Sequence, residues 1–144
     1  MFDKLLLPTD GSDLSIAAAH NAVALAKLAG ARLNAVYVVE PYPYTGIGAA
    51  RSAGFDEYMA AAREHAAQAF ARIGEVAAAQ GVQVESQIVE DAEPAHGILE
   101  AARLLDADVI VMGSHGRSGA ARLLLGSVTA KVLAQATLPV LVVK

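Results

Sequence analysis

The sequence predicts an α/β protein with a doubly wound, five-stranded parallel sheet and four helices, folded as a single domain over residues 1–144. Three observations lead to this prediction. Short apolar runs of strand length alternate along the chain with longer segments of helical periodicity. Glycine or proline stands at most junctions between them, where the chain must turn. A length of 144 residues is enough for one domain with a substantial core and too short for two.

The first third of the chain is typical of a strand, a helix and a second strand. We expect a buried strand over residues 2–7, a helix that is capped by Ser12 or Asp13 and stopped by Gly30, and a strand over residues 33–39. A strand–helix–strand unit of this size implies parallel strands joined by a right-handed crossover.

The middle of the chain should contain a loop and a long helix. Residues 42–54 (YPYTGIGAARSAG) have no clear period, so we expect a mobile loop that acts as a lid over the carboxyl edge of the sheet. Asp56 is the expected start of a helix that runs to Gln80 and ends at Gly81. Its inward-facing stripe should be Ala62, Ala66, Ala69, Ile73 and Val76.

The remaining elements follow the same alternation. Residues 82–89 alternate between apolar and polar side chains, which indicates an edge strand with one wetter face. Pro94 suits the first position of the next helix, because its missing N–H is not needed there. We then expect a strand over residues 109–112, a helix over residues 127–135 and a strand over residues 139–143.

The most informative stretch is residues 109–128, VIVMGSHGRSGAARLLLGSV. An apolar strand stops at Gly113, Gly116 follows, and Gly126 and Ser127 stand where a helix begins. In open α/β sheets, ligands bind at the carboxyl ends of the strands. Glycines allow backbone N–H groups to approach a phosphate, and a helix N-terminus favours an anion. We interpret the stretch as a phosphate cradle of unknown type, although glycines that only make turns would give the same pattern.

Two common glycine motifs are excluded. The G-x-x-x-x-G-K-[ST] spacing of a Walker A loop and its lysine are missing. The stretch also lacks the dinucleotide pattern G-x-G-x-x-G and follows the fourth strand instead of the first.

Two other strand ends should meet the glycines at the same edge of the sheet. The Asp10 carboxylate can accept hydrogen bonds from a ribose or an adenine, or face a metal ion, but it can equally cap the following helix. Val38 offers backbone groups that can pair with the edge of an adenine; otherwise it is an ordinary core valine.

The pattern Gly113-x2-Gly116-x9-Gly126-Ser127, together with Asp10, resembles the ATP-binding branch of the universal stress protein family. The resemblance extends over the whole chain, from LLLPTDGS at residues 5–12 to LPVLVVK at residues 138–144. It implies the strand order 3-2-1-4-5, with ATP as the ligand and Mg or Mn as an open question. Carried over by position, it implies nucleotide contacts from Pro8, Thr9, Asp10, Val38, Met112, Gly113, Gly116, Arg117, Gly126, Ser127 and Val128.

Two features of the chain limit the comparison. Arg117 and Arg122 lie in the variable excursion between the glycines, where a solvated surface position is the alternative for each. Glu93 stands before Pro94, where the family would have glycine or asparagine, and this difference concerns the start of a helix more than the nucleotide site.

The resemblance implies an ATP-binding stress-response protein that acts as a nucleotide-dependent sensor or switch. The alternative is a slow ATPase or adenylyl-handling enzyme that uses the same pocket. The complete glycine set disfavours a third possibility, an interaction module that is independent of ATP.

The sequence offers little catalytic machinery. Rapid phosphoryl transfer draws on a metal ion, cationic groups and an oriented water, and Asp10 is the only candidate here for holding the ion. His115 is the only histidine in the glycine loop. His20, His65 and His96 have no Cys, Asp or Glu at ligand spacing, so structural roles are expected for them. We therefore predict slow ATP hydrolysis at most.

Composition narrows the possible partners and the location. A net charge of −4 without a long basic run argues against nucleic acid. The longest apolar runs fall well short of the about 20 residues of a membrane span, and the N-terminus lacks the features of a signal peptide. The chain has no cysteine, which is compatible with a reducing compartment. We expect a cytoplasmic protein without a membrane partner.

The last strand suggests a second copy as partner. Residues 139–143 are apolar on both faces, and the implied strand order places them at an edge of the sheet. An open apolar edge invites uncontrolled pairing, which a closed two-fold assembly prevents. We expect a homodimer through residues 138–143.

Overall fold

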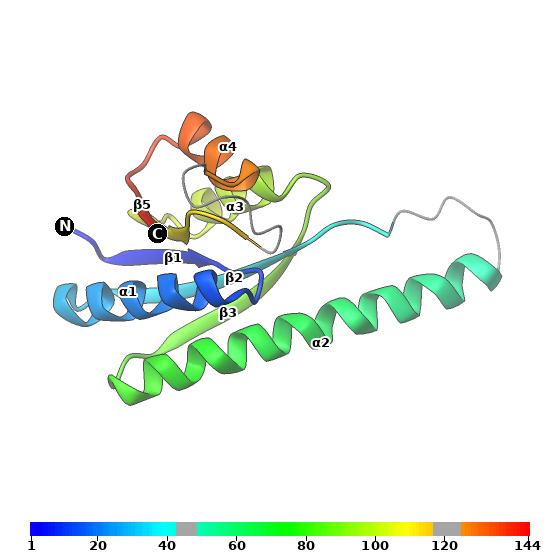
Figure 1. The fold of residues 1–144 in the computed structure, drawn as a ribbon, viewed down its shortest axis with the longest axis horizontal. Helices are drawn as coiled ribbons and strands as arrows, with labels where there is room; N and C mark the ends of the chain where they lie inside the picture. Colours follow the sequence, from blue (N-terminus) through cyan, green and yellow to red (C-terminus); the bar gives the residue numbers. More distant parts are fainter. Residues whose placement is uncertain (43–48, 117–124) are drawn as a thin grey trace.

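Five parallel strands form one sheet with helices on both faces, in a computed structural model that describes residues 1–42, 49–116 and 125–144 (Figure 1). The strand order within these residues is β3-β2-β1-β4-β5, and every neighbouring pair is parallel. The predicted fold class and strand order are therefore confirmed. The elements are β1 (Lys4–Pro8), α1 (Asp13–Ala29), β2 (Arg32–Val39), α2 (Ala49–Ala79), β3 (Val84–Glu90), α3 (Pro94–Leu104), β4 (Val109–Gly113), α4 (Ser127–Gln135) and β5 (Val140–Val143).

The alternation of side chains along the strands divides the core into two layers. Helices α1 and α2 cover one face of the sheet, and α3 and α4 cover the other (Figure 1). In β1, Leu5 and Leu7 are buried against α1, whereas Leu6 is buried on the side of α3 and α4. Successive side chains of a strand point to opposite sides of the sheet, and helices cover both sides, so the central strands contribute to both core layers.

Helix α1 has the predicted ends. The Ser12 side chain accepts a hydrogen bond from the N–H of Ser15 at 3.2 Å, and Gly30 closes the helix with a positive φ of 66°. Its buried side consists mainly of alanines, which allow the helix to lie close to the sheet. The first strand begins two residues later than predicted, and at its start the N–H groups of Asp3 and Lys4 donate to the carboxylate of Asp108 at 2.6 Å and 2.8 Å.

The predicted start of the long helix is wrong. Helix α2 begins at Ala49 instead of Asp56, so the second half of the predicted lid loop is helical, and residues 43–48 lie outside the described part of the chain. The segment before Gly54 is rich in alanine, the best helix former, and this favours extension of the helix. Gly54 itself is inside the helix, where the hydroxyl group of Tyr42 occupies the space that a Cβ would need. Tyr42 also packs against Tyr58 of the same helix, with ring centroids 5.3 Å apart.

The predicted inward stripe of α2 is largely confirmed. Ala66, Ala69 and Ile73 are buried, while Ala62 and Val76 are partly buried. The helix ends one residue before the predicted Gln80, and Gly81 follows with a positive φ of 71°. The strand β3 starts later than predicted because the N–H of Val82 donates to the carbonyl of Ala77 at 2.9 Å.

Gly74 of α2 offers a test of helix stability. A Cβ added at this position would meet no atom within 4 Å. Because glycine in a helix costs about 0.5–1 kcal/mol relative to alanine, Gly74→Ala should raise the free energy of unfolding by roughly that amount. Urea denaturation of the wild type and the variant measures the difference. A lower urea concentration at the unfolding midpoint of Gly74→Ala would contradict the open surroundings of Gly74.

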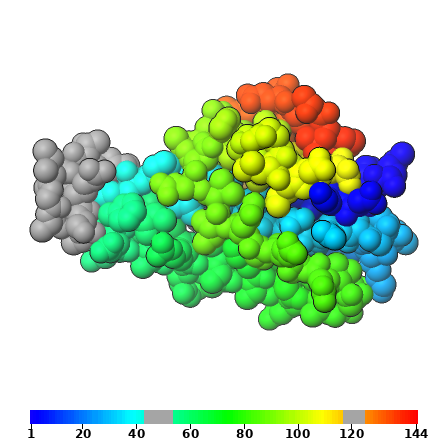
Figure 2. Space-filling model, turned by 180° about the vertical axis from the view of Figure 1, so that it is seen from behind, coloured from blue at the N-terminus to red at the C-terminus, as the bar shows by residue number. Residues whose placement is uncertain are grey.

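Strands β3 and β5 form the two edges of the sheet. Strand β3 is an edge strand as predicted, and most of its side chains are exposed. Strand β5 forms the other edge, and its Leu141 is 43% exposed. Figure 2 shows α4 and α2 on opposite sides of the molecule.

In the part of the chain that the structure describes, no helix combines the length and apolar character needed to cross a membrane.

Candidate functional site

A cavity of about 220 Å³ opens where β1, β2 and β4 end and where α3 and α4 begin. Every predicted site residue except Arg117 lines it; Arg117 and Arg122 lie outside the described residues. Residues from three distant parts of the sequence therefore meet at the carboxyl edge of the sheet. The structure adds lining residues that we did not predict as nucleotide contacts: Ser15, Val36, Pro94, Ile98, His115 and Thr129.

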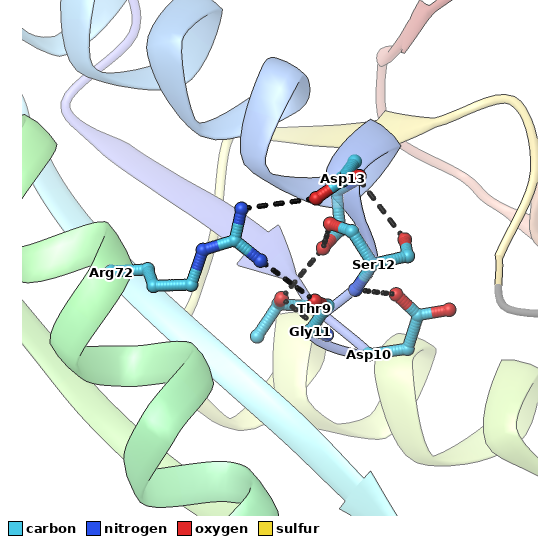
Figure 3. Close-up of polar contacts among 7 residues, drawn as sticks. Thr9, Asp10, Gly11, Ser12, Asp13 and Arg72 are labelled. Atoms are coloured by element: carbon cyan, nitrogen blue, oxygen red, sulfur yellow. Dashed lines mark hydrogen bonds and ion pairs between the residues drawn. The ribbon is translucent and has the colours of Figure 1, made fainter.

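The loop between β1 and α1 forms one wall and is held rigidly (Figure 3). The N–H of Thr9 donates to the Val36 carbonyl at 2.9 Å and continues the pairing of the sheet. Oδ1 of Asp10 accepts the N–H of Ser12 at 2.9 Å. The sequence left open whether Asp10 serves a ligand or the helix, and this bond shows that one carboxylate oxygen serves the helix start.

A chain of hydrogen bonds fixes the hydroxyl groups of this wall. The Gly11 N–H donates to Thr9 Oγ1 at 3.1 Å, Thr9 Oγ1 lies 3.0 Å from Ser15 Oγ, and Ser15 Oγ donates to the Ser12 carbonyl at 2.7 Å. Since the single proton of Ser15 is used toward Ser12, Thr9 must donate to Ser15. Toward the cavity, these two hydroxyl groups can therefore act only as acceptors.

Arg72 of α2 supports the same loop from outside. Its Nη1 donates to the Gly11 carbonyl at 3.1 Å, and its Nη2 contacts Oδ1 of Asp13 at 3.1 Å (Figure 3). Sequence reasoning missed Arg72, because no local pattern connects it to a loop some sixty residues earlier in the chain.

Two glycines of the opposite wall lie close to their neighbours. A Cβ at Gly116 would overlap Oδ2 of Asp10, so the two walls touch at this point. A Cβ at Gly126 would lie 3.2 Å from both the Cα of His115 and the carbonyl oxygen of Ser114. These neighbours are backbone atoms and cannot move independently.

The two ends of the excursion between β4 and α4 are tied together. The Gly126 N–H donates to the Ser114 carbonyl at 2.7 Å. Thr129 Oγ1 donates to the Gly113 carbonyl at 2.8 Å in a buried position. The start of α4 is therefore fixed against the end of β4, whatever the intervening residues do.

Helix α4 presents its N-terminus to the cavity. Gly126 occupies the N-cap position and provides no side-chain cap, and Ser127, Val128 and Thr129 of the first turn line the cavity. The first N–H groups of a helix have no partner within the helix, and its dipole is positive at this end. Such an end is suited to bind an anion.

The remaining lining is apolar and comes mainly from Val36, Val38, Ile98 and Met112. The cavity thus combines oxygen acceptors on the β1 side, helix N–H donors on the α4 side and an apolar surface between them. This arrangement suits a ligand with hydroxyl or amino groups, an apolar ring and an anionic group.

His115 lines the cavity, but its contact with Ser114 does not make a nucleophile. The Nδ1 of His115 lies 2.9 Å from Ser114 Oγ. Ser114 is only 3% exposed and is not among the lining residues. A nucleophile must reach the bound ligand, so this pair orients His115 and does not activate Ser114.

His96 has the kind of structural role that was expected, in a contact with Asp91. Asp91 Oδ2 lies 2.6 Å from His96 Nδ1, and Asp91 Oδ1 accepts the Glu93 N–H at 2.8 Å. The turn between β3 and α3 brings the two side chains together. The hydrogen bond lowers the pKa of Asp91 and raises the pKa of His96. Glu93, which differs from the family pattern, contacts Lys131 of α4 at 3.3 Å instead of capping α3.

This pair makes stability depend on pH. The raised pKa of His96 implies a contribution that is fully present below the usual histidine value of about 6.5 and is lost as the pH rises through the raised value. The lowered pKa of Asp91 implies a contribution that is lost as the pH falls through the lowered value. The pair therefore stabilises the start of α3 at mildly acidic pH.

Asp91→Asn tests this contact. The amide keeps an acceptor for the Glu93 N–H but carries no charge, so the pKa of His96 should fall toward the usual histidine value. NMR titration of the His96 ring resonances measures the change. An identical titration curve in the two proteins would show that Asp91 does not hold the imidazolium.

Together, the sheet and the cavity define a doubly wound α/β protein with a candidate ligand site at its carboxyl edge. The model of the universal stress protein family matches residues 1–144. A universal stress protein of Methanocaldococcus jannaschii is 38% identical over 144 residues, which cover 100% of this chain and 83% of the relative. This chain therefore belongs to the universal stress protein family.

Solved structures agree with this assignment. Universal stress protein UspA from Lactobacillus plantarum matches with a TM-score of 0.87 and 29% identity, covering 99% of this chain and 98% of that one. A universal stress protein in complex with cAMP matches with a TM-score of 0.70 and 28% identity, covering 99% and 97% of the two chains.

Proposed function

We propose that residues 1–144 form a nucleotide-binding domain that binds ATP in this cavity and acts as a nucleotide-dependent sensor or switch. The observation that carries the proposal is the pairing of an acceptor-lined wall at Asp10 with the uncapped N-terminus of α4 across one cavity. A nucleotide has hydroxyl and amino donors at one end and phosphates at the other, so it complements both walls. The relative in complex with cAMP supports an adenine nucleotide.

In this proposal, the nucleoside lies toward β1 and β2. Asp10 contacts the nucleoside, and Pro8 and Thr9 shape the wall beside it. The backbone of Val38 meets the adenine, while Met112 lies beside the ribose.

The phosphates lie toward β4 and α4. Gly113 is placed near the α-phosphate, and Gly116, Gly126, Ser127 and Val128 surround the remaining phosphates. Arg117 stays a predicted phosphate contact, since it lies outside the described residues.

A metal ion in this site would bind together with the nucleotide. Within residues 1–42, 49–116 and 125–144, no three acidic or histidine side chains are grouped so that they could hold a metal ion. Asp10 is placed to contribute one ligand, so we propose that Mg²⁺ or Mn²⁺ would arrive with the phosphates. Such an ion would neutralise phosphate charge in the site.

Calorimetric titration with ATP, ADP, AMP and cAMP tests the proposal. Saturable binding of an adenine nucleotide is expected, with GTP and UTP as controls for the base. Mass spectrometry of the supernatant after denaturation identifies any nucleotide that co-purifies. The absence of binding for every adenine nucleotide, with and without Mg²⁺ or Mn²⁺, would refute the function.

The alternative function is a slow ATPase or adenylyl-handling enzyme in the same cavity. Single-turnover hydrolysis of radiolabelled ATP distinguishes it from a sensor. We expect a rate far below the about 1–1000 s⁻¹ that is typical of enzymes. Turnover within that range would contradict the sensor function and support the enzymatic one.

We further propose a homodimer through residues 138–143 and a cytoplasmic location. Strand β5 lies at an edge of the sheet, and the exposed Leu141 lies on it. Light scattering at micromolar concentration should give twice the mass of one chain. Leu141→Glu should shift the protein toward the monomer, whereas a wild-type monomer would contradict the proposal.

A further inference from the structure

Gly97 is a buried glycine in the first turn of α3. Glycine at a helical position costs about 0.5–1 kcal/mol relative to alanine, so its presence calls for a packing reason. A Cβ at Gly97 would lie 3.0 Å from the Cβ of Asp91. It would also lie 3.0 Å and 3.2 Å from the two methyl carbons of Val38. These distances are shorter than the about 3.5–4.0 Å that is optimal between carbon atoms.

The two neighbours differ in their freedom to move. Asp91 is fixed by its N–H bond to the Val39 carbonyl at 3.0 Å and by the contacts of its carboxylate with Glu93 and His96. Val38 is only half-buried and lines the cavity. An additional methyl group at position 97 should therefore displace the Val38 side chain toward the cavity. Its contact with the Cβ of Asp91 is not relieved by this movement and adds a cost to stability.

We propose that Gly97 is a positioning residue that sets the width of the cavity on its β2 side. Without a Cβ at position 97, Val38 lies against α3, and the apolar part of the cavity stays wide enough for the base of a nucleotide. This inference rests on the proposed function. Gly97 itself is not among the residues that line the cavity, so it acts through Val38.

A mutant cycle with ATP binding as the readout tests the coupling. Gly97→Ala should weaken ATP binding roughly tenfold, the scale of one methyl group in an apolar pocket. In the Val38→Ala background, the same substitution should change the dissociation constant less than twofold. Gly74→Ala is the matched control, since its surroundings are open, and it should leave the affinity unchanged. Equal losses in both backgrounds would overturn the inference.

A second measurement does not depend on nucleotide binding. The Val38 methyl resonances of the ligand-free protein should shift in Gly97→Ala, while those of Val23, a buried residue of α1 on the other face of the sheet, should stay unchanged. If the wild type binds no nucleotide, the proposed function fails, and these resonances alone decide the inference. Unmoved Val38 methyl groups would then overturn it.

The double variant covers the case in which Gly97→Ala does not fold. If steric contact with Val38 is the reason that Gly97→Ala does not fold, the double variant Val38→Ala/Gly97→Ala should fold. It should then bind ATP with the affinity of the single variant Val38→Ala. Failure of the double variant to fold would show that the contact with Asp91, and not the contact with Val38, requires glycine at this position, and it would overturn the inference.

Discussion

Gly126→Val is expected to abolish measurable ATP binding. The position is buried, and a side chain there meets backbone atoms of Ser114 and His115 at 3.2 Å. Relief requires moving the first turn of α4 away from β4 and breaking the 2.7 Å bond from Gly126 to Ser114. The helix N–H groups would then no longer face the phosphates in the proposed binding mode. With about 1.5–3 kcal/mol for each hydrogen bond to a charged group, losing two such bonds weakens binding by roughly a hundredfold or more.

Calorimetry with ATP measures this loss, and circular dichroism shows whether the variant stays folded. Gly126→Ala should have a smaller effect of the same direction, because a single methyl group needs a smaller displacement. Gly74→Ala, a glycine substitution in open surroundings, should bind ATP as the wild type does. A folded Gly126→Val protein with normal affinity would refute the placement of phosphates at α4.

Leu6→Ala should produce the largest loss of stability. Leu6 is fully buried in the central strand, opposite Asn34 of β2 and Ile110 of β4. It packs in the core between the sheet and the pair α3 and α4. Truncating a buried leucine typically costs about 2–5 kcal/mol, because transfer energy is lost and a cavity remains. The central strand has neighbours on both sides, so the surroundings can collapse only partly.

The matched control is the same substitution, leucine to alanine, at an exposed position. Leu104 ends α3 and is 68% exposed, so Leu104→Ala should change the free energy of unfolding by less than about 0.5 kcal/mol. Urea denaturation of both variants measures the difference. Similar effects at the two positions would mean that the α3 and α4 side of the sheet is not a packed core.

Local signals in the sequence predicted much of this fold. Helix α4 has the predicted bounds, because a glycine before Ser127 and the apolar residues after it mark its start clearly. The three glycines and Asp10 could be predicted to converge, since the carboxyl ends of parallel strands share one edge. The strand order came from the family resemblance, because periodicity alone does not determine which strands are neighbours.

The errors arose where distant contacts override local preference. Gly54 and the nearby tyrosine and proline residues are typical of a loop, but packing of Tyr42 on Gly54 accommodates a helix there. Arg72 supports the β1–α1 loop across the fold, through a contact between residues far apart in the sequence. No periodicity contains such pairings.

The bare N-terminus of α4 has a thermodynamic consequence. Gly126 supplies no side-chain cap, so a phosphate bound there would complete the helix and act as its cap. A ligand that binds only the folded state stabilises it by about 2.7 kcal/mol at roughly 100 times its Kd. If ATP is the ligand as proposed, the melting temperature of the protein should rise with the ATP concentration, so that resistance to unfolding would itself report how much ATP is present.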